Sequence, residues 1–132
     1  MGLFQLRRGQ ATVEFALGVM VWMYIAMGVV DFGRAFFVYN IVANTAREGA
    51  RYATIPSNTS ADIISYATAR SGISGVTVEV LARGTAAAGY SGTPAEVRAS
   101  ATFTPITPLI SQICCSGGPL TLQAKSTMYV EL

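Results

Sequence analysis

An uncharged apolar run from Phe15 to Val30 constrains this chain more than any other feature of its sequence. As a helix rising about 1.5 Å per residue, the run would cover roughly 24 Å of a bilayer core that is about 30 Å thick. We therefore expect a membrane span over about residues 13–30. Arg7 and Arg8 precede the run, and a basic N-terminal flank predicts a cytoplasmic N-terminus, with the residues after Asp31 exported.

Glu14 stands at the head of the apolar run. An acidic side chain at the centre of a membrane helix costs about 2.5–3.5 kcal/mol, and somewhat less near the interface. Ionisable residues at such depths usually mark function, so we interpret the basic pair, Gly9 and Glu14 as a processing and assembly signal. An ordinary secretory signal is the competing interpretation, but no A-x-A-like site follows the run.

The composition excludes several classes of function. Without residues 1–9 the basic and acidic residues balance, and no basic stripe with interleaved aromatic residues remains, so we expect no nucleic-acid partner. The chain has no histidine, no suitably spaced carboxylate pair, no glycine-rich phosphate loop and no C-x-x-C motif. We therefore expect no catalytic residue, no metal ligand and no cofactor.

A single long helix is predicted from about Gln10 to Thr54, because no proline interrupts this stretch. Beyond the span, one stripe recurs at three- and four-residue spacing, which indicates a packed face. Its members are Phe36, Tyr39, Ala43, Ala46, Ala50 and Ala53. Arg47, Glu48 and Arg51 fall on other faces. These charges form either the exposed side of the helix or a contact with another subunit.

The remaining residues, 56–132, predict a small exported domain. Ser60 or Asp62 can cap a short helix over residues 61–71. Three segments then alternate apolar and polar residues, at about 76–83, 96–104 and 120–132. Such alternation is typical of antiparallel strands with one buried face. The predicted fold is α+β, with a long N-terminal transmembrane and amphipathic helix packed on a small antiparallel sheet and one short extra helix.

The chain has two cysteines, and they are neighbours, Cys114 and Cys115. They fall in the predicted exported domain, where oxidation is permitted. A bond between neighbours is strained, because bridged Cα atoms usually lie about 4.4–6.8 Å apart and adjacent ones about 3.8 Å. Reduced or buried thiols, a strained bridge between the two, and links to other chains all stay open.

Three stretches of the sequence resemble the TadE-like family, minor pilins or pseudopilins of the tight-adherence (Flp/Tad) pilus within the type IV pilus superfamily. They are RRGQATVEFAL at residues 7–17, VVDFGRAF at 29–36 and ANTAREGARYA at 43–53. The resemblance implies that residues 1–9 are a leader, which a prepilin peptidase removes after Gly9 to make Gln10 the new N-terminus. Glu14 is then the fifth residue of the mature chain, followed by the aromatic Phe15. Gly18 lies where related spans often have a proline.

The resemblance implies a structural subunit that enters a pilus through its N-terminal helix, for adhesion or surface attachment. Its partners would be the peptidase, other pilin subunits, the inner-membrane assembly platform and the membrane. It would reside in the bacterial inner membrane, with an extracytoplasmic C-terminal domain, and pass into a surface filament. The alternative is an uncleaved, single-pass scaffold or binding module of the pilus or secretion machinery. A membrane-anchored enzyme is disfavoured by the residue inventory.

Overall fold

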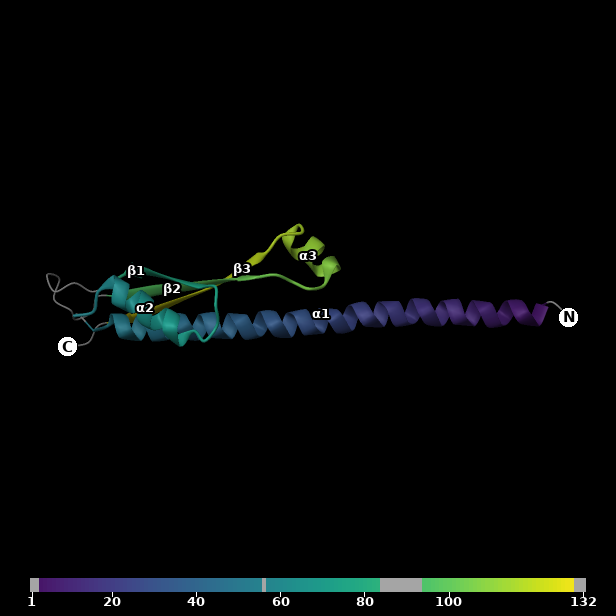
Figure 1. Cartoon of the computed structure of the whole chain (residues 1–132), viewed down its shortest axis with the longest axis horizontal. Coiled ribbons are helices and arrows are strands. Elements are labelled where there is room, and N and C mark those ends of the chain that lie inside the picture. Colours follow the sequence, from purple (N-terminus) through teal and green to yellow (C-terminus); the bar gives the residue numbers. More distant parts are fainter. Residues whose placement is uncertain (1–2, 56, 84–93, 130–132) are drawn as a thin grey trace.

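α1, Leu3–Ala53, is one unbroken helix that runs along most of the molecule in this computed structural model (Figure 1). The structure describes residues 3–55, 57–83 and 94–129, without the side chains of 3–8, 109 and 115. The helix begins at Leu3 rather than at the expected Gln10. The physical reason is composition, because the leucine, glutamine and arginine residues before Gly9 are good helix formers.

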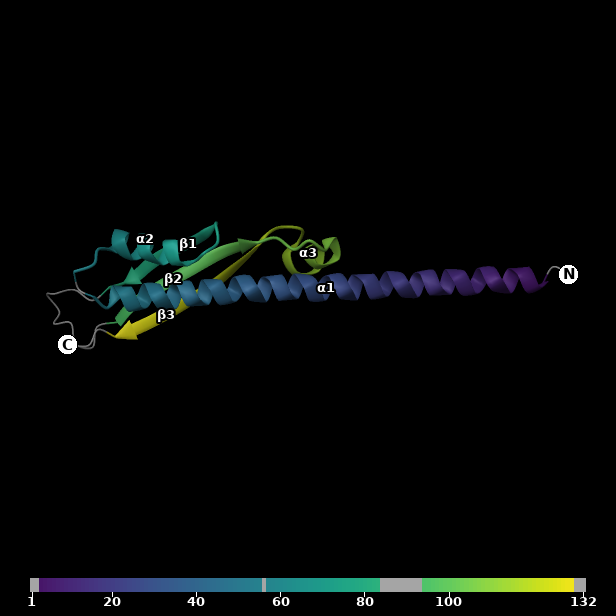
Figure 2. The ribbon, with the colours of Figure 1, turned by 60° about the horizontal axis from the view of Figure 1, so that its bottom comes forward.

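The other elements gather beside the C-terminal half of α1 and leave its N-terminal half alone (Figures 1 and 2). In chain order they are the helix α2, the strands β1 and β2, the helix α3 and the strand β3. Their bounds are Ser60–Arg70 for α2, Val76–Ala82 for β1, Pro94–Phe103 for β2, Pro108–Cys115 for α3 and Leu120–Tyr129 for β3. The fold is the predicted α+β arrangement of a long apolar helix packed on a three-stranded antiparallel sheet.

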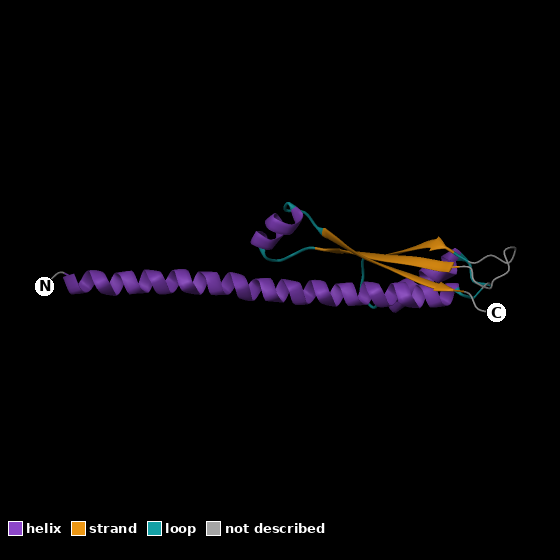
Figure 3. Ribbon diagram, turned by 180° about the vertical axis from the view of Figure 1, so that it is seen from behind, coloured by secondary structure: helices purple, strands orange, loops and turns teal. Residues whose placement is uncertain are grey.

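The sheet has the order β1-β2-β3, with both pairs antiparallel (Figure 3). The register places Val78 opposite Ala99, and Ala99 opposite Ala124. Of these three side chains, Val78 and Ala99 are buried and Ala124 is half-buried. The alternation predicted from the sequence is confirmed, because each strand turns one set of side chains toward the helices.

The other face of the sheet carries ion pairs that cross between strands. Arg98 on β2 lies 3.3 Å from Glu79 on β1, and Lys125 on β3 lies 2.9 Å from Glu96 on β2. The hydrogen bond with Lys125 lowers the pKa of Glu96 below its ordinary value. Pairs of this exposed kind contribute little stability, about 0.2–1 kcal/mol each. They identify the polar face of the sheet.

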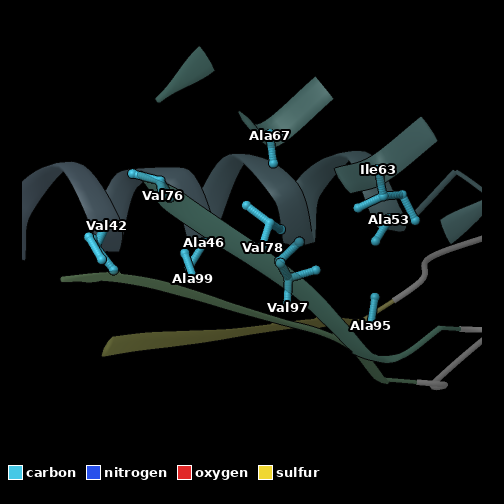
Figure 4. Close-up of a cluster of buried hydrophobic side chains, with 12 residues drawn as sticks. Val42, Ala46, Ala53, Ile63, Ala67, Val76, Val78, Ala95, Val97 and Ala99 are labelled. Atoms are coloured by element: carbon cyan, nitrogen blue, oxygen red, sulfur yellow. The ribbon is translucent and has the colours of Figure 1, made fainter. Parts of the chain in front are cut away.

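The core lies where α1, α2 and one face of the sheet meet (Figure 4). Small side chains dominate it, and the largest fully buried ones are Ile63, Val42 and Val97. At Gly49 the helix lies close to both the sheet and α2, because a Cβ atom added there would lie 3.0 Å from Cγ1 of Val97 on β2 and 3.3 Å from Cβ of Ala67 on α2. Alanine and glycine on α1 thus let the sheet pack directly against the helix.

The predicted stripe on α1 is confirmed at its C-terminal end and wrong at its N-terminal end. Ala46, Ala50 and Ala53 are buried, but Phe36 and Tyr39 are exposed by 59% and 45%. The chosen residues repeat at close to 3.5 positions, and in a straight helix such a pattern drifts by about 20° per heptad. The face that packs continues instead through Val42, Val38, Ala35 and Asp31, as buried or half-buried positions.

Two local features of the domain differ from expectation. The cap of α2 is Thr59 rather than Ser60, and Thr59 and Asp62 form a reciprocal capping box. Hydrogen bonds from the hydroxyl and the amide of Thr59 lower the pKa of Asp62. Between the last two strands, where no helix was predicted, the chain forms α3 with Pro108 at its start. Proline is well tolerated in a first helical turn.

Candidate assembly site

The N-terminal half of α1 exposes large apolar side chains on every side. Phe15 and Trp22 are exposed by 73% and 75%, and Val29 by 67%. By length and composition, α1 from Gly9 onward can cross a membrane, and none of its apolar window is buried. In a soluble protein such a surface would aggregate, so it requires either lipid or another protein around it.

The predicted cleavage and register residues lie on this bare part of α1. Gly9, Gln10 and Glu14 are exposed, and among the described residues nothing approaches within 4 Å of a Cβ atom placed on Gly9. The bond between Gly9 and Gln10 is helical, since α1 begins at Leu3. Of the ion pairs between described side chains, none involves Glu14. The carboxylate at the head of the span is therefore open to a partner from outside.

The charged residues predicted as a possible subunit contact do not form one cluster. Arg47 donates a 3.4 Å hydrogen bond to the side chain of Asn44. Glu48 and Arg51 instead line a hollow of about 510 Å³ between α1 and α2. Arg70 of α2 also lines this hollow. Its place there depends on how α2 packs against α1, which no local sequence pattern indicates.

Two stacked aromatic side chains also line this hollow. The rings of Tyr52 on α1 and Tyr66 on α2 are stacked with centroids 4.2 Å apart. Arg70 donates a 3.3 Å hydrogen bond to the Tyr66 hydroxyl, and the interaction with Tyr66, followed by the charge of Glu48, raises the pKa of Arg70. This arrangement fixes the angle between the two helices. A contact with another subunit stays a prediction for these residues.

Asp31, which lies just beyond the span at 13–30, is a residue that the sequence did not single out beyond marking the end of that span. It is only 2% exposed, although it is charged. Its two carboxylate oxygens accept hydrogen bonds from the amides of Ile106 at 3.1 Å and Thr107 at 2.7 Å, and Arg34 adds a 3.1 Å ion pair. The hydrogen bond from Ile106, followed by those from Thr107, lowers the pKa of Asp31 to about 2.

This contact joins two segments that are distant in the sequence. The amides belong to the chain just before α3. Asp31 therefore connects the α3 region to α1 at the outer end of the span. Arg34 also lies over the ring of Phe103, with its guanidinium carbon 5.3 Å from the ring centroid. A lone acid at the end of an apolar run was the available signal, but its two distant partners are backbone amides, which leave no mark in the sequence.

Cys114 at the end of α3 takes part in a disulfide. The side chain of Cys115 lies outside the described residues. A bridge between the two neighbours therefore stays a prediction.

Most of α1, including its bare N-terminal half, matches the model of a known protein family. Residues 9–51 match the family model described as TadE-like protein. Over this stretch, about a third of the chain, the sequence is similar to the TadE-like family. The TadE-like family is a structural family associated with the Tad pilus, which together with the apolar α1 fits a membrane-anchored protein of that pilus system. No curated protein and no solved structure matches the chain significantly.

The TadE-like match covers both halves of α1 and ends just before the helix does. It includes Glu14 in the bare half, Asp31 at the junction, and Gly49 under the sheet. The domain that follows lies outside the matched residues. The family match therefore describes the helical stem, whereas the sheet that it carries is described by the structure alone.

Proposed function

We propose that this chain is a pilin-like subunit of a Tad-type pilus, processed after Gly9 and assembled through the N-terminal half of α1. The domain beside the C-terminal half would then be displayed outside the membrane. The observation that carries the proposal is the division of α1, which holds its own domain along one half and leaves the other half uncovered.

Glu14 distinguishes this proposal from simple anchoring. A membrane anchor gains nothing from a carboxylate at the head of its span, where it costs free energy. Cleavage before Gln10 would create an α-amine four positions from Glu14 in each subunit. Opposite charges about 4 Å apart attract by about 4 kcal/mol at the effective dielectric of a protein surface. Pairing of Glu14 with the amine of a neighbouring subunit would offset the cost of burial and set the register between subunits.

One observation favours the alternative of an uncleaved scaffold in the pilus machinery. The bond between Gly9 and Gln10 is inside a helix, and a protease needs its substrate backbone locally extended. Gly9 lowers the barrier to opening the helix there, because glycine costs about 1 kcal/mol in a helix interior relative to alanine. The two functions therefore differ in whether the first nine residues stay attached.

The decisive experiment is the intact mass of the chain purified from cells that have the prepilin peptidase and from cells that lack it. The proposal predicts loss of Met1–Gly9 only when the peptidase is present. Gly9→Leu is the control variant, because nothing packs against Gly9, so the fold is kept while cleavage is blocked. The full-length mass in both strains would support the scaffold and remove the processing claim.

A second experiment tests Glu14 itself. Glu14→Asp keeps the charge, whereas Glu14→Gln keeps the shape without it. We expect the aspartate variant to enter sheared filaments and the glutamine variant to stay in the membrane fraction, with equal total amounts of protein. Equal incorporation of both variants would show that the carboxylate charge does not set register.

A further inference from the structure

α3 reaches back along α1 to a level inside the apolar run (Figures 1 and 3). The methyl carbon Cδ1 of Ile110 on α3 would lie 3.5 Å from a Cβ atom placed on Gly28. Gly28 precedes Val30, the last residue of the apolar run. The helix α3 therefore stands beside the outer end of the span, rather than with the sheet farther along α1.

The chain around α3 contains no charge. Between Arg98 and Lys125 there is no Asp, Glu, Lys or Arg. Within this stretch, large apolar side chains point away from the protein, since Ile106 is exposed by 59% and Ile113 by 77%. Phe32 on the adjoining part of α1 is exposed by 73%. Together they form an apolar rim around the outer end of the span, next to Arg34, whose side chain is 45% exposed.

The one acid at this level is hidden by the same loop. Asp31 is buried, and the amides of Ile106 and Thr107 together with Arg34 occupy its oxygens. A charged side chain ordinarily limits how far a hydrocarbon phase can extend along a helix. With Asp31 covered, α1 exposes no charged side chain between Glu14 and Arg34. This stretch is about 30 Å of helix, which matches the about 30 Å hydrocarbon core and places the level of α3 at the headgroup layer.

We propose that the segment from Thr104 to Leu120, here called the α3 loop, is a second membrane contact that inserts Ile106 and Ile113 into the outer interfacial layer of the bilayer. Its partner is the apolar and glycerol region of the lipid, because the loop has no basic residue to bind an anionic headgroup. The contact is continuous with the span through Ile110 and Gly28. It fixes the exported domain close to the membrane before assembly.

The experiment uses the full chain in phosphatidylcholine vesicles with brominated acyl chains, which quench tryptophan by contact. Trp22, the only tryptophan, is first replaced in the variant Trp22→Phe. Ile113→Trp and Ile106→Trp then place single probes on the α3 loop. Ile55→Trp is the matched control, because Ile55 is also exposed but lies at the opposite end of α1 from the span.

The proposal predicts that both loop probes are quenched, more strongly by bromine near the headgroup than near the chain ends, and that the Ile55→Trp probe is not. Loop probes that are as unquenched as the control would overturn it. A blue-shifted but unquenched loop probe whose shift disappears on dilution of the protein in the bilayer would also overturn it, and would assign this rim to a second copy of the chain. Quenching that requires anionic lipid would contradict an uncharged contact. Circular dichroism of each variant verifies that the fold is kept.

Discussion

The two halves of α1 share one helical backbone but differ in the side chains that they present. In the N-terminal half, bulky side chains such as Trp22 project on all sides, and a Cβ atom on Gly18 would meet nothing within 4 Å. In the C-terminal half, small residues lie under the sheet, and a Cβ atom on Gly49 would press on Val97 at 3.0 Å. The first half is built for surroundings that the chain does not supply, and the second for a sheet that it does supply.

This difference teaches that hydrophobicity alone does not say where a helix packs. Both halves carry apolar side chains, yet the size of the side chains at the packed positions separates them. Close packing of a sheet on a helix requires small residues, whereas lipid and neighbouring helices accommodate large ones. Glycine therefore plays different parts at two positions of one helix. At Gly49 it is needed for close packing, and at Gly18 it is only tolerated.

Removing a core side chain should give the largest effect on the covered part. Ile63 is fully buried, and Ile63→Ala should lower the free energy of unfolding of the domain by about 2–5 kcal/mol through lost burial and a cavity. Ile25→Ala, at a residue 61% exposed on the bare half, should leave it unchanged. Denaturant unfolding of the full chain in detergent measures both, and equal losses would contradict the division of α1.

A methyl group on each glycine should sharpen the same comparison. Gly49→Ala should destabilise the domain by about 1–3 kcal/mol through overpacking against Val97. Gly18→Ala should be neutral or slightly stabilising, because alanine is the better helix former. Unfolding midpoints test this pair, and adding Val97→Ala should recover part of the loss at Gly49. Without such recovery, the cost would not come from the Gly49–Val97 contact.

Asp31 at the boundary between the halves should give a smaller, pH-dependent effect. The pKa of Asp31 in the folded chain is about 2, below its ordinary 3.8, so its contribution is present above 3.8 and lost as the pH falls toward 2. Asp31→Asn should therefore lower the unfolding midpoint at neutral pH by a few degrees, with a difference that shrinks on acidification. A difference that stays constant with pH would show that the charge plays no part.

The fold could be predicted from local patterns wherever one side-chain period repeats. The alternation in residues 96–104 and the alanines from Ala46 to Ala53 identify the buried faces of β2 and α1 without a structure. The same reasoning chose Phe36 wrongly. A short stripe fits a repeat of about 3.5 residues as well as the period of about 3.6 residues of a straight helix, and the two repeats diverge with distance from the alanines.

Contacts between distant segments could not be predicted. Asp31 binds backbone amides about seventy-five positions away, and any residue type would supply those amides. α3 is bounded by prolines and glycines, which indicate turns, and its eight residues are too few for a helical period to be recognised in the sequence. The roles assigned to Glu14 and Gly9 rest on a local sequence pattern and stay predictions, because their partners would come from other molecules.

Assembly through the bare half of α1 requires that other subunits surround this half in the filament. A photo-crosslinking amino acid in place of Phe15, next to Glu14, would report its neighbour in filaments sheared from cells. If Glu14 pairs with the α-amine of a neighbouring subunit, we expect a crosslink to the N-terminal segment of that subunit, beginning at Gln10. Crosslinks only to lipid, or to the chain's own domain, would contradict it.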